Sequence, residues 1–407
     1  MQNTNACNAC QQCQPRLDNY SKLPDEKEFE FKNISPWVFV THNCTCACPY
    51  CMIPKIDGSP EKNMTSETFR KMLEVTEKLL EKKIIEKIHF RLSGGEPLAA
   101  FHKYKDIVTE YRKKYNNDMT FGILTNGTIF TDEIADWMNE NKIGTQVSLD
   151  DLISGKPLKN GQSSSEKVLA NIQKMQRKGI NFAINTVLDI TKTKDLTELA
   201  NFVISFKDMT WGLNASYTET DENKIKEVID IFDKCIFQLV KRGFDIYNKL
   251  RFYNTIVGKR SGGCSAGVSS FAIGTNLEVW SCQTLCDGDP LGIYSEDIKE
   301  RLETSEKNKY YYNKGLMRRC VDCPVLGECR GGCRSTHSNI KINDVVCRIR
   351  INILTKIMNG YYHQNNTQNC SCNEHNHDHG NGINKILETI DTKETQIVDD
   401  TPLIECE

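Results

Sequence analysis

The chain has 407 residues with 52 basic and 54 acidic side chains, so its formal net charge is -2. This length can hold two domains, or one large domain with a smaller appendage, and the balanced charge gives no sign of a nucleic-acid partner. No apolar run reaches the length of a membrane span, and the polar segment 1–22 has no signal-peptide core. We therefore expect a cytoplasmic protein without membrane attachment.

Strand-like and helix-like segments alternate from Trp37 to about Ala215, which is typical of a βα repeat with a parallel sheet. We expect strands at 37–41, 87–92, 119–125, 143–149, 180–188 and 209–215. Apolar residues at helical spacing predict helices at 66–83, 166–178 and 222–242. Thr65 or Ser66 can cap the first helix, and Cys235 in the third should be a small buried hydrophobe.

Nineteen cysteines are present, and in a reducing compartment this number favours metal or cluster ligation over disulfides. Some of them lie near the chain ends, namely Cys7, Cys10 and Cys13 in one segment and Cys370 and Cys372 in the other. Both segments could bind a metal. Their polar composition favours mobile termini with incidental thiols.

A cysteine-rich loop follows the first expected strand. Cys44, Cys48 and Cys51 have the spacing C-x3-C-x2-C, with Cys46 inside the run and Tyr50 before the last cysteine. Three thiolates on so short a loop suit one face of a [4Fe-4S] cluster, because soft sulfur ligands favour iron–sulfur clusters. Three ligands for four irons leave one iron open for chemistry. Zinc binding is the alternative.

The second expected strand ends in the run Ser93-Gly94-Gly95-Glu96-Pro97. Together with the cysteine loop, this run resembles the radical S-adenosylmethionine (SAM) family, whose open iron chelates SAM and whose reduction yields a 5'-deoxyadenosyl radical. The resemblance implies a partial barrel, which six βα units fit. It also implies that the two glycines let backbone approach the methionine end of SAM, and that Glu96 accepts from the SAM ammonium.

Further SAM contacts are implied at the carboxyl ends of the third and fourth strands, where parallel α/β sheets bind ligands. Asn126 would lie near the methionyl group, and Ser148 or Asp150 would bond the ribose hydroxyls, with turn and capping roles as the alternative. Many relatives carry an arginine after the fourth strand that helps to hold the SAM carboxylate. This chain offers only Lys156 and Lys159 there, and which of them, if either, takes that role stays open. The implied cofactor-binding residues are Tyr50, Gly94, Gly95, Glu96, Pro97, Asn126, Ser148 and Asp150.

A second cysteine group lies beyond a Gly/Ser-rich bend at 258–267, which marks the expected domain boundary. Its members are Cys264, Cys282, Cys320, Cys323, Cys329, Cys333 and Cys347. Their spacing resembles the SPASM domain of radical SAM peptide-modifying enzymes, which holds two auxiliary [4Fe-4S] clusters. One departure is Leu277, where relatives usually carry glycine. A zinc ribbon is the alternative interpretation.

The resemblance implies a ligand set for each auxiliary cluster. The first would be held by Cys264, Cys282 and Cys333. The second would be held by Cys320, Cys323, Cys329 and Cys347. The first cluster then lacks an obvious fourth ligand, so either Cys286 closes the site or one iron stays open, and we favour Cys286.

The expected fold class is therefore α/β, a partial (βα)6 TIM-like barrel followed by a small cysteine-rich SPASM domain. The expected division of the chain is a polar extension at 1–33, the barrel at 34–220, a helical linker at 221–262, the SPASM domain at 263–360 and a polar tail at 361–407.

The resemblance also implies a function. SPASM-type relatives mostly mature ribosomally made peptides, so we expect hydrogen abstraction from a precursor peptide that leads to a thioether or carbon–carbon crosslink. The cofactors would be three [4Fe-4S] clusters and SAM, with an electron donor such as flavodoxin or ferredoxin. Because residues 1–36 are too few to bury a core, we expect a separate leader-binding protein or recognition by the barrel and SPASM surfaces.

Two other functions stay open. In anaerobic sulfatase maturases, which form formylglycine, an aspartate follows the second auxiliary cysteine, whereas this chain has Gln283. That departure counts against a sulfatase maturase without excluding it. The hypothesis from another class is a non-catalytic iron–sulfur or zinc-binding module. No catalytic side chain can be assigned from the sequence.

Overall fold

The structure is a computed structural model, and it describes most of the chain between residues 31 and 364. The described residues are 31–51, 63–216, 221–252, 255–256, 265–286, 288–305, Asn308, Cys323, Val325, Cys329 and 340–364. The terminal cysteines singled out above, together with Cys264, Cys320 and Cys333, lie outside these residues. Within the described residues, no helix is long and apolar enough to cross a membrane.

One sheet forms the centre of the molecule, and its strands from β2 to β8 run parallel to one another. These strands are β2 (Trp37–Thr41), β3 (Lys87–Gly94), β4 (Met119–Thr125), β5 (Gly144–Ser148), β6 (Phe182–Leu188), β7 (Trp211–Ala215) and β8 (Leu250–Phe252). The short strand β1 (Asn33–Ile34) pairs with β3, and β9 (Thr255–Ile256) pairs antiparallel with β8.

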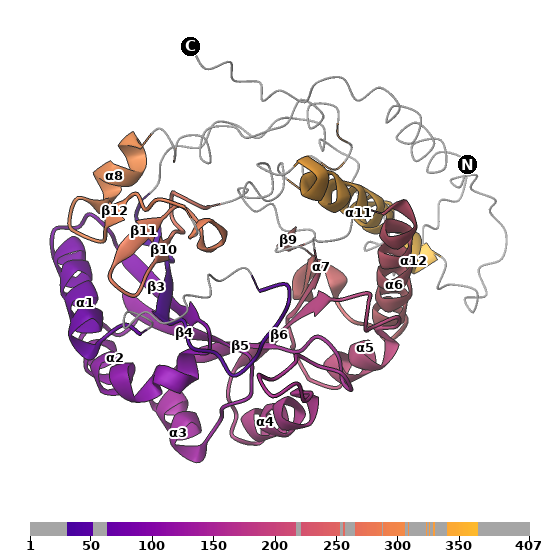
Figure 1. Cartoon of the computed structure of the whole chain (residues 1–407), viewed down its shortest axis with the longest axis horizontal. Coiled ribbons are helices and arrows are strands. Elements are labelled where there is room, and N and C mark those ends of the chain that lie inside the picture. Colours follow the sequence, from indigo (N-terminus) through magenta and orange to yellow (C-terminus); the bar gives the residue numbers. More distant parts are fainter. Residues whose placement is uncertain are drawn as a thin grey trace, which may run out of the picture.

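Helices surround the strands on the outside, so the sheet curves into an open partial barrel (Figure 1). In chain order they are α1 (Ser66–Glu81), the 3-10 helix η3 (Pro97–Ala100), α2 (Phe101–Tyr115), α3 (Asp132–Glu140), α4 (Ser165–Arg177), α5 (Thr197–Ile204), α6 (Glu222–Lys241) and α7 (Ile246–Lys249). The expected α/β fold with a partial barrel is confirmed.

The predicted strands and helices are all present. The strands β2 and β4 have the predicted bounds, while β6 and β7 each begin two residues later than expected. Thr65 is the residue that caps α1, because its side chain accepts from the backbone N–H of Thr68. Cys235 is fully buried in α6, as predicted for a small hydrophobe.

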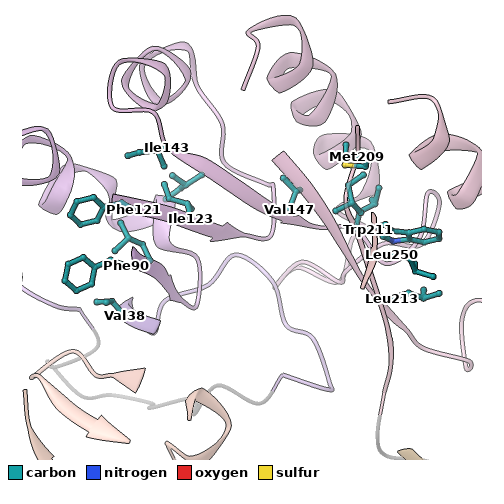
Figure 2. Packing of buried hydrophobic residues seen from close by; sticks show 14 of the residues in the cluster. Val38, Phe90, Phe121, Ile123, Ile143, Val147, Met209, Trp211, Leu213 and Leu250 are labelled. Carbon is teal, nitrogen blue, oxygen red and sulfur yellow. The ribbon is translucent and has the colours of Figure 1, made fainter. Parts of the chain in front are cut away.

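The barrel core consists of aliphatic and aromatic residues at alternating positions of the strands. Figure 2 shows Phe90 and Phe121 from neighbouring strands, whose ring centroids are 5.3 Å apart, in the same cluster as Trp211. All three are no more than 2% exposed. This packing fixes the strands, and therefore the loops at their carboxyl ends, where the candidate site lies.

The chain after residue 264 continues the same sheet at its other edge. Strand β10 (Ala272–Ile273) pairs parallel with β2, followed by β11 (Glu278–Trp280) and β12 (Gly292–Ile293) in antiparallel order. The remaining elements are η4 (Gln283–Leu285), α8 (Ile298–Thr304), α11 (Ile340–Met358) and α12 (Tyr361–Gln364). Helix α11 packs against α6 beside the barrel (Figure 1).

Leu277 lies in the turn between β10 and β11, with a φ of 69°. This left-handed conformation is one that glycine adopts without cost and that a leucine adopts with strain. The side chain of Leu277 is only 3% exposed, so its burial offsets part of that strain. The backbone therefore gives a physical reason why glycine suits this position in relatives.

Candidate SAM and iron–sulfur site

The loop after β2 holds the first cysteine group at the carboxyl end of the sheet. It is fixed by a short antiparallel pairing with the loop after β5, in which Ala47 N–H donates to the carbonyl of Pro157 at 2.8 Å and Cys46 pairs with Leu158. Cys46 is 6% exposed. Cys44 and Cys48 are half-buried, and Cys51 is exposed. The three spaced cysteines therefore remain accessible while Cys46 does not.

Hydrogen bonding within the loop favours the thiolate forms of two candidate ligands. Hydrogen bonding with the Cys46 side chain lowers the pKa of Cys44 to about 6 and the pKa of Cys48 to about 7, and the Cys46 backbone N–H also donates to Sγ of Cys44 at 3.4 Å. The same contacts, together with burial, raise the pKa of Cys46 well above its usual range. Since the thiolate is the metal-binding form, the local electrostatics separates two candidate ligands from Cys46.

The turn after β3 lies against the cysteine loop. Gly95 N–H donates to the carbonyl of Thr41 at 2.7 Å, and Glu96 N–H donates to the carbonyl of Asn43 at 2.7 Å. A Cβ atom at Gly94 would lie 2.0 Å from the carbonyl oxygen of Thr41, and one at Gly95 would lie 2.2 Å from that of Asn43. In this structure the two glycines permit the close approach of two backbones, so the turn positions the cysteine loop.

Glu96 is fully buried, and its carboxylate accepts three hydrogen bonds from within the chain. Oε1 accepts from Leu98 N–H at 3.1 Å and from the Thr125 hydroxyl at 2.8 Å, and Oε2 accepts from Asn126 N–H at 2.7 Å. Burial nevertheless raises the pKa of Glu96 to about 7. The carboxylate therefore joins η3 to the end of β4, a role that the sequence did not predict.

Asn126 connects the end of β4 to the cysteine loop. Its Nδ2 donates to the Thr45 hydroxyl at 2.8 Å and to Sγ of Cys44 at 3.5 Å, while its Oδ1 accepts from Thr128. The hydroxyls of Thr45 and Thr128 are 2.7 Å apart. The two threonines were missed by sequence reasoning, because threonines in loops carry no signal of their own. Asn126 is thus next to a candidate cluster ligand.

Tyr50, Asp150 and Lys156 form a buried polar group beside the same loop. Lys156 Nζ lies 2.7 Å from Asp150 Oδ2 and 2.6 Å from the Tyr50 hydroxyl, which also donates to Asp150. The lysine ammonium lies 4.9 Å from the centre of the Tyr50 ring. Burial alone would lower the pKa of Lys156, but the nearby negative groups, of which Asp150 has the largest effect, raise it. The charge of Lys156 in turn helps to lower the pKa of Cys48. Lys159 is exposed.

The strand ends around this group supply further polar side chains. Ser148 is half-buried at the end of β5, and Asp150 Oδ1 accepts from Val187 N–H at 3.0 Å. Tyr50 and Asp150 line a narrow hollow of about 10 Å³ together with Asp189 and other residues of the loop after β6. Sequence reasoning did not single out Asp189. These contacts bring Tyr50, Asp150 and the end of β6 together.

The second cysteine group is described in part. Cys282 and Cys286 flank η4, and the Cys286 thiol lies 3.6 Å from the carbonyl oxygen of Cys282. Cys323, Cys329 and Cys347 are half-buried, the first two against the apolar core.

The cysteine side chains of the loop after β2 meet what a [4Fe-4S] cluster requires of its ligands. Among the described residues, no three His, Cys, Asp or Glu side chains converge as ligands for one metal ion. A cubane does not require such convergence, because each thiolate binds a different iron. Soft, accessible sulfurs on one loop, two of them with lowered pKa values and one beside the Asn126 amide, fit a [4Fe-4S] cluster.

Comparisons with known proteins agree with this chemistry. The sequence model of the Radical SAM superfamily matches residues 38–203, so this part of the chain is a radical SAM domain. That domain contains the cysteine loop, the Gly-Gly-Glu turn and the strand ends described above. Members of this superfamily use SAM with a [4Fe-4S] cluster.

Several curated proteins are similar over most of the chain. A radical SAM cyclopropyl synthase from Paramaledivibacter caminithermalis is 20% identical over 72% of this chain and 66% of its own length. A cysteine-type anaerobic sulfatase-maturating enzyme from Clostridium novyi is 24% identical over 72% of this chain and 85% of its length. An uncharacterised Methanocaldococcus jannaschii protein matches a shorter part, at 28% identity over 41% of this chain and 57% of its own length. The chain thus spans about two thirds or less of two of these relatives.

Solved structures share the fold. The enzyme anSMEcpe with bound AdoMet and the Cp18Cys peptide superposes with a TM-score of 0.62 at 18% identity, covering 81% of this chain and 99% of that one. Streptococcus suis SuiB bound to its precursor peptide SuiA gives a TM-score of 0.54 at 13% identity, covering 74% of this chain and 72% of that one.

Proposed function

We propose that this protein is a SAM-dependent peptide maturase that abstracts hydrogen from a residue of a ribosomally made precursor peptide and thereby installs a thioether or carbon–carbon crosslink. The radical SAM domain supports the first half of this proposal. Similarity to a cyclopropyl synthase, and a fold shared with an enzyme bound to its precursor peptide, support the second half.

One observation carries the proposal. Accessible Cys44 and Cys48 with lowered pKa values lie on a loop that the Gly-Gly-Glu turn and Asn126 fix at the carboxyl end of the sheet. We assign Cys44, Cys48 and Cys51 as ligands of one [4Fe-4S] cluster. When bound and reduced, this cluster and SAM supply the 5'-deoxyadenosyl radical.

The chain's own residues have defined tasks in this mechanism. Asn126 and the turn at Gly94 and Gly95 hold the ligand loop in place, and they would orient the methionyl end of SAM. Asp150 would bond the ribose. Of the two lysines in the loop after β5, we assign the buried Lys156 to the carboxylate of SAM, since Lys159 is exposed.

We also propose two auxiliary [4Fe-4S] clusters, with the ligand sets inferred from the SPASM resemblance and with Cys286 completing the first. Iron and sulfide assays after anaerobic reconstitution should then reach about twelve irons per chain. A plateau near four irons would overturn the auxiliary clusters. Bound zinc without visible absorption would overturn the whole proposal and would favour the zinc-binding module.

The second candidate function is an anaerobic sulfatase maturase, which the Clostridium novyi relative favours because its length is covered more fully than that of the cyclopropyl synthase. In sulfatase maturases the aspartate at this position acts as a base. Gln283, which follows Cys282, argues against this function because a glutamine cannot act as a base.

Mass spectrometry can distinguish these functions. The chain would be co-expressed anaerobically with a short peptide encoded beside its gene and, separately, with a sulfatase. Loss of two hydrogens per event in the short peptide supports crosslinking. Deuterium uptake without that loss indicates epimerisation. An unchanged peptide together with a sulfatase cysteine converted to formylglycine would establish the second candidate.

A further inference from the structure

Arg350 lies on α11, three residues after Cys347, and is 4% exposed. Its Nη1 atom lies 3.8 Å from Sγ of Cys329, in hydrogen-bonding contact. Residues three apart on a helix are neighbours on its surface, so this contact brings Cys329 to the part of α11 that carries Cys347. A buried cation therefore lies beside two cysteines that the proposed function assigns to one cluster.

The chemistry of this contact is that of a permanent charge next to a thiolate. A guanidinium is always protonated in proteins and only donates hydrogen bonds. A hydrogen bond between ionised partners is stronger than one between neutral partners, and the low dielectric around a buried group strengthens it further. Arg350 is therefore suited to stabilise negative charge on Sγ of Cys329.

We propose that Arg350 raises the reduction potential of the second auxiliary cluster by donating to Sγ of Cys329. This inference rests on the proposed function, which assigns Cys329 and Cys347 to that cluster. Reduction adds one electron, so the reduced cluster carries one more negative charge than the oxidised one. A cation and a hydrogen bond at a ligand sulfur stabilise the reduced form more, and hydrogen bonds to the sulfurs are known determinants of these potentials.

In the proposed reaction, a higher reduction potential makes the second auxiliary cluster a better electron acceptor. A crosslink removes two hydrogens, one as a hydrogen atom and the other as a proton and an electron. The proton passes to solvent through a base, and the electron requires an acceptor. Arg350 would favour transfer of that electron to the cluster that Cys329 and Cys347 bind.

An anaerobic redox titration tests this role without the peptide substrate. In the full chain, Cys44, Cys48 and Cys51 are all replaced by Ala, so that only the auxiliary clusters are reconstituted. Dithionite is the reductant, and electron paramagnetic resonance measures the fraction reduced at each potential. Arg350→Met removes the charge, and Arg350→Lys keeps it without the planar fork. Lys356→Met is the matched control, because this lysine of the same helix pairs with Asp233.

In Arg350→Met, one of the two midpoints should fall, with about a tenfold lower ratio of reduced to oxidised cluster at a fixed potential, which is 59 mV for a one-electron couple. In Arg350→Lys the same midpoint should fall by less, and in Lys356→Met both midpoints should stay unchanged. Two unchanged midpoints in a fully loaded Arg350→Met variant would overturn the inference.

Loss of the cluster is also informative. If Arg350→Met loads only one auxiliary cluster, a fully loaded Arg350→Lys with one lowered midpoint still supports the inference. If both variants lose the cluster, Arg350 serves assembly and the inference is wrong. If the chain with Arg350 intact loads no auxiliary cluster, the proposed function has failed, and iron analysis distinguishes that result from a failure of the inference alone.

Discussion

At the residue scale, the chemistry of the site depends on which thiols can ionise. Four cysteines lie within eight residues, yet their environments differ. Cys46 is buried between Cys44 and Cys48, and its contacts with them lower their pKa values and raise its own. The spacing of the motif and the electrostatics of the loop therefore agree on Cys44 and Cys48.

Replacing Cys44, Cys48 or Cys51 with Ala should abolish reductive cleavage of SAM, because each change removes a ligand of the only cluster that is proposed to bind it. Cys46→Ala should keep most of the cleavage activity. Chromatography of 5'-deoxyadenosine formed with dithionite under anaerobic conditions measures both results. Activity that survives Cys48→Ala but is lost in Cys46→Ala would show that the ligand register is wrong.

Lys156→Met should weaken SAM binding at least tenfold and destabilise the fold by about 3–5 kcal/mol, because it leaves the carboxylate of Asp150 buried without its cation. Equilibrium dialysis with labelled SAM and denaturant unfolding measure the two effects. Lys159→Met is the matched control in the same loop and should change neither quantity, since Lys159 is exposed. Equal effects of the two substitutions would show that Lys156 does not belong to the SAM site.

At the element scale, every element placed from the sequence has at least five residues, but length alone did not suffice, because the long helices α2 and α11 were not predicted. Hydrophobic periodicity predicted the strands from β2 to β7 and the helices α1, α4 and α6, because each spans several repeats of its pattern. Strands of two or three residues, such as β10, carry no such repeat. In the same way, motifs located the cysteine loop and the Gly-Gly-Glu turn. The contacts of Thr45 with Thr128 and of Lys156 with Tyr50 arise only when distant loops meet.

Glu96 joins two elements, and it should make stability depend on pH. Its pKa is about 7 in the folded state, above the ordinary value of 4.5, because of burial. The folded state therefore holds this proton more tightly than the unfolded state. The stabilisation is complete below about pH 4.5 and is lost as the pH rises towards 7.

The variant Glu96→Gln isolates this effect, since glutamine does not titrate. The unfolding free energy of the unsubstituted protein, minus that of Glu96→Gln, should fall between about pH 4.5 and 7. Denaturant unfolding of the cluster-free protein in this range measures the difference. A difference that rises over this interval would mean that the three hydrogen bonds to the carboxylate outweigh its burial.

At the scale of the whole molecule, the sheet does not end where the barrel helices end. The edge strand of the radical SAM domain, β2, is covered by β10 from the chain beyond residue 264. A parallel edge strand with exposed backbone groups would otherwise offer a site for aggregation. The cysteine loop follows β2 directly, so the three short strands β10, β11 and β12 support the strand that leads into the loop of cluster ligands.

Two isoleucines of these three strands test that support. Ile273 in β10 is fully buried opposite Val38, whereas Ile293 in β12 is 47% exposed. Ile273→Ala should cost about 2–5 kcal/mol of unfolding free energy through lost burial and the cavity left behind, and it should also lower iron occupancy of the SAM cluster. Ile293→Ala should stay within about 0.5 kcal/mol. Denaturant unfolding and iron analysis measure both. If Ile273→Ala loses stability but retains full iron, these strands stabilise the fold without supporting the cysteine loop, and the proposed link from them to the cluster through β2 is wrong.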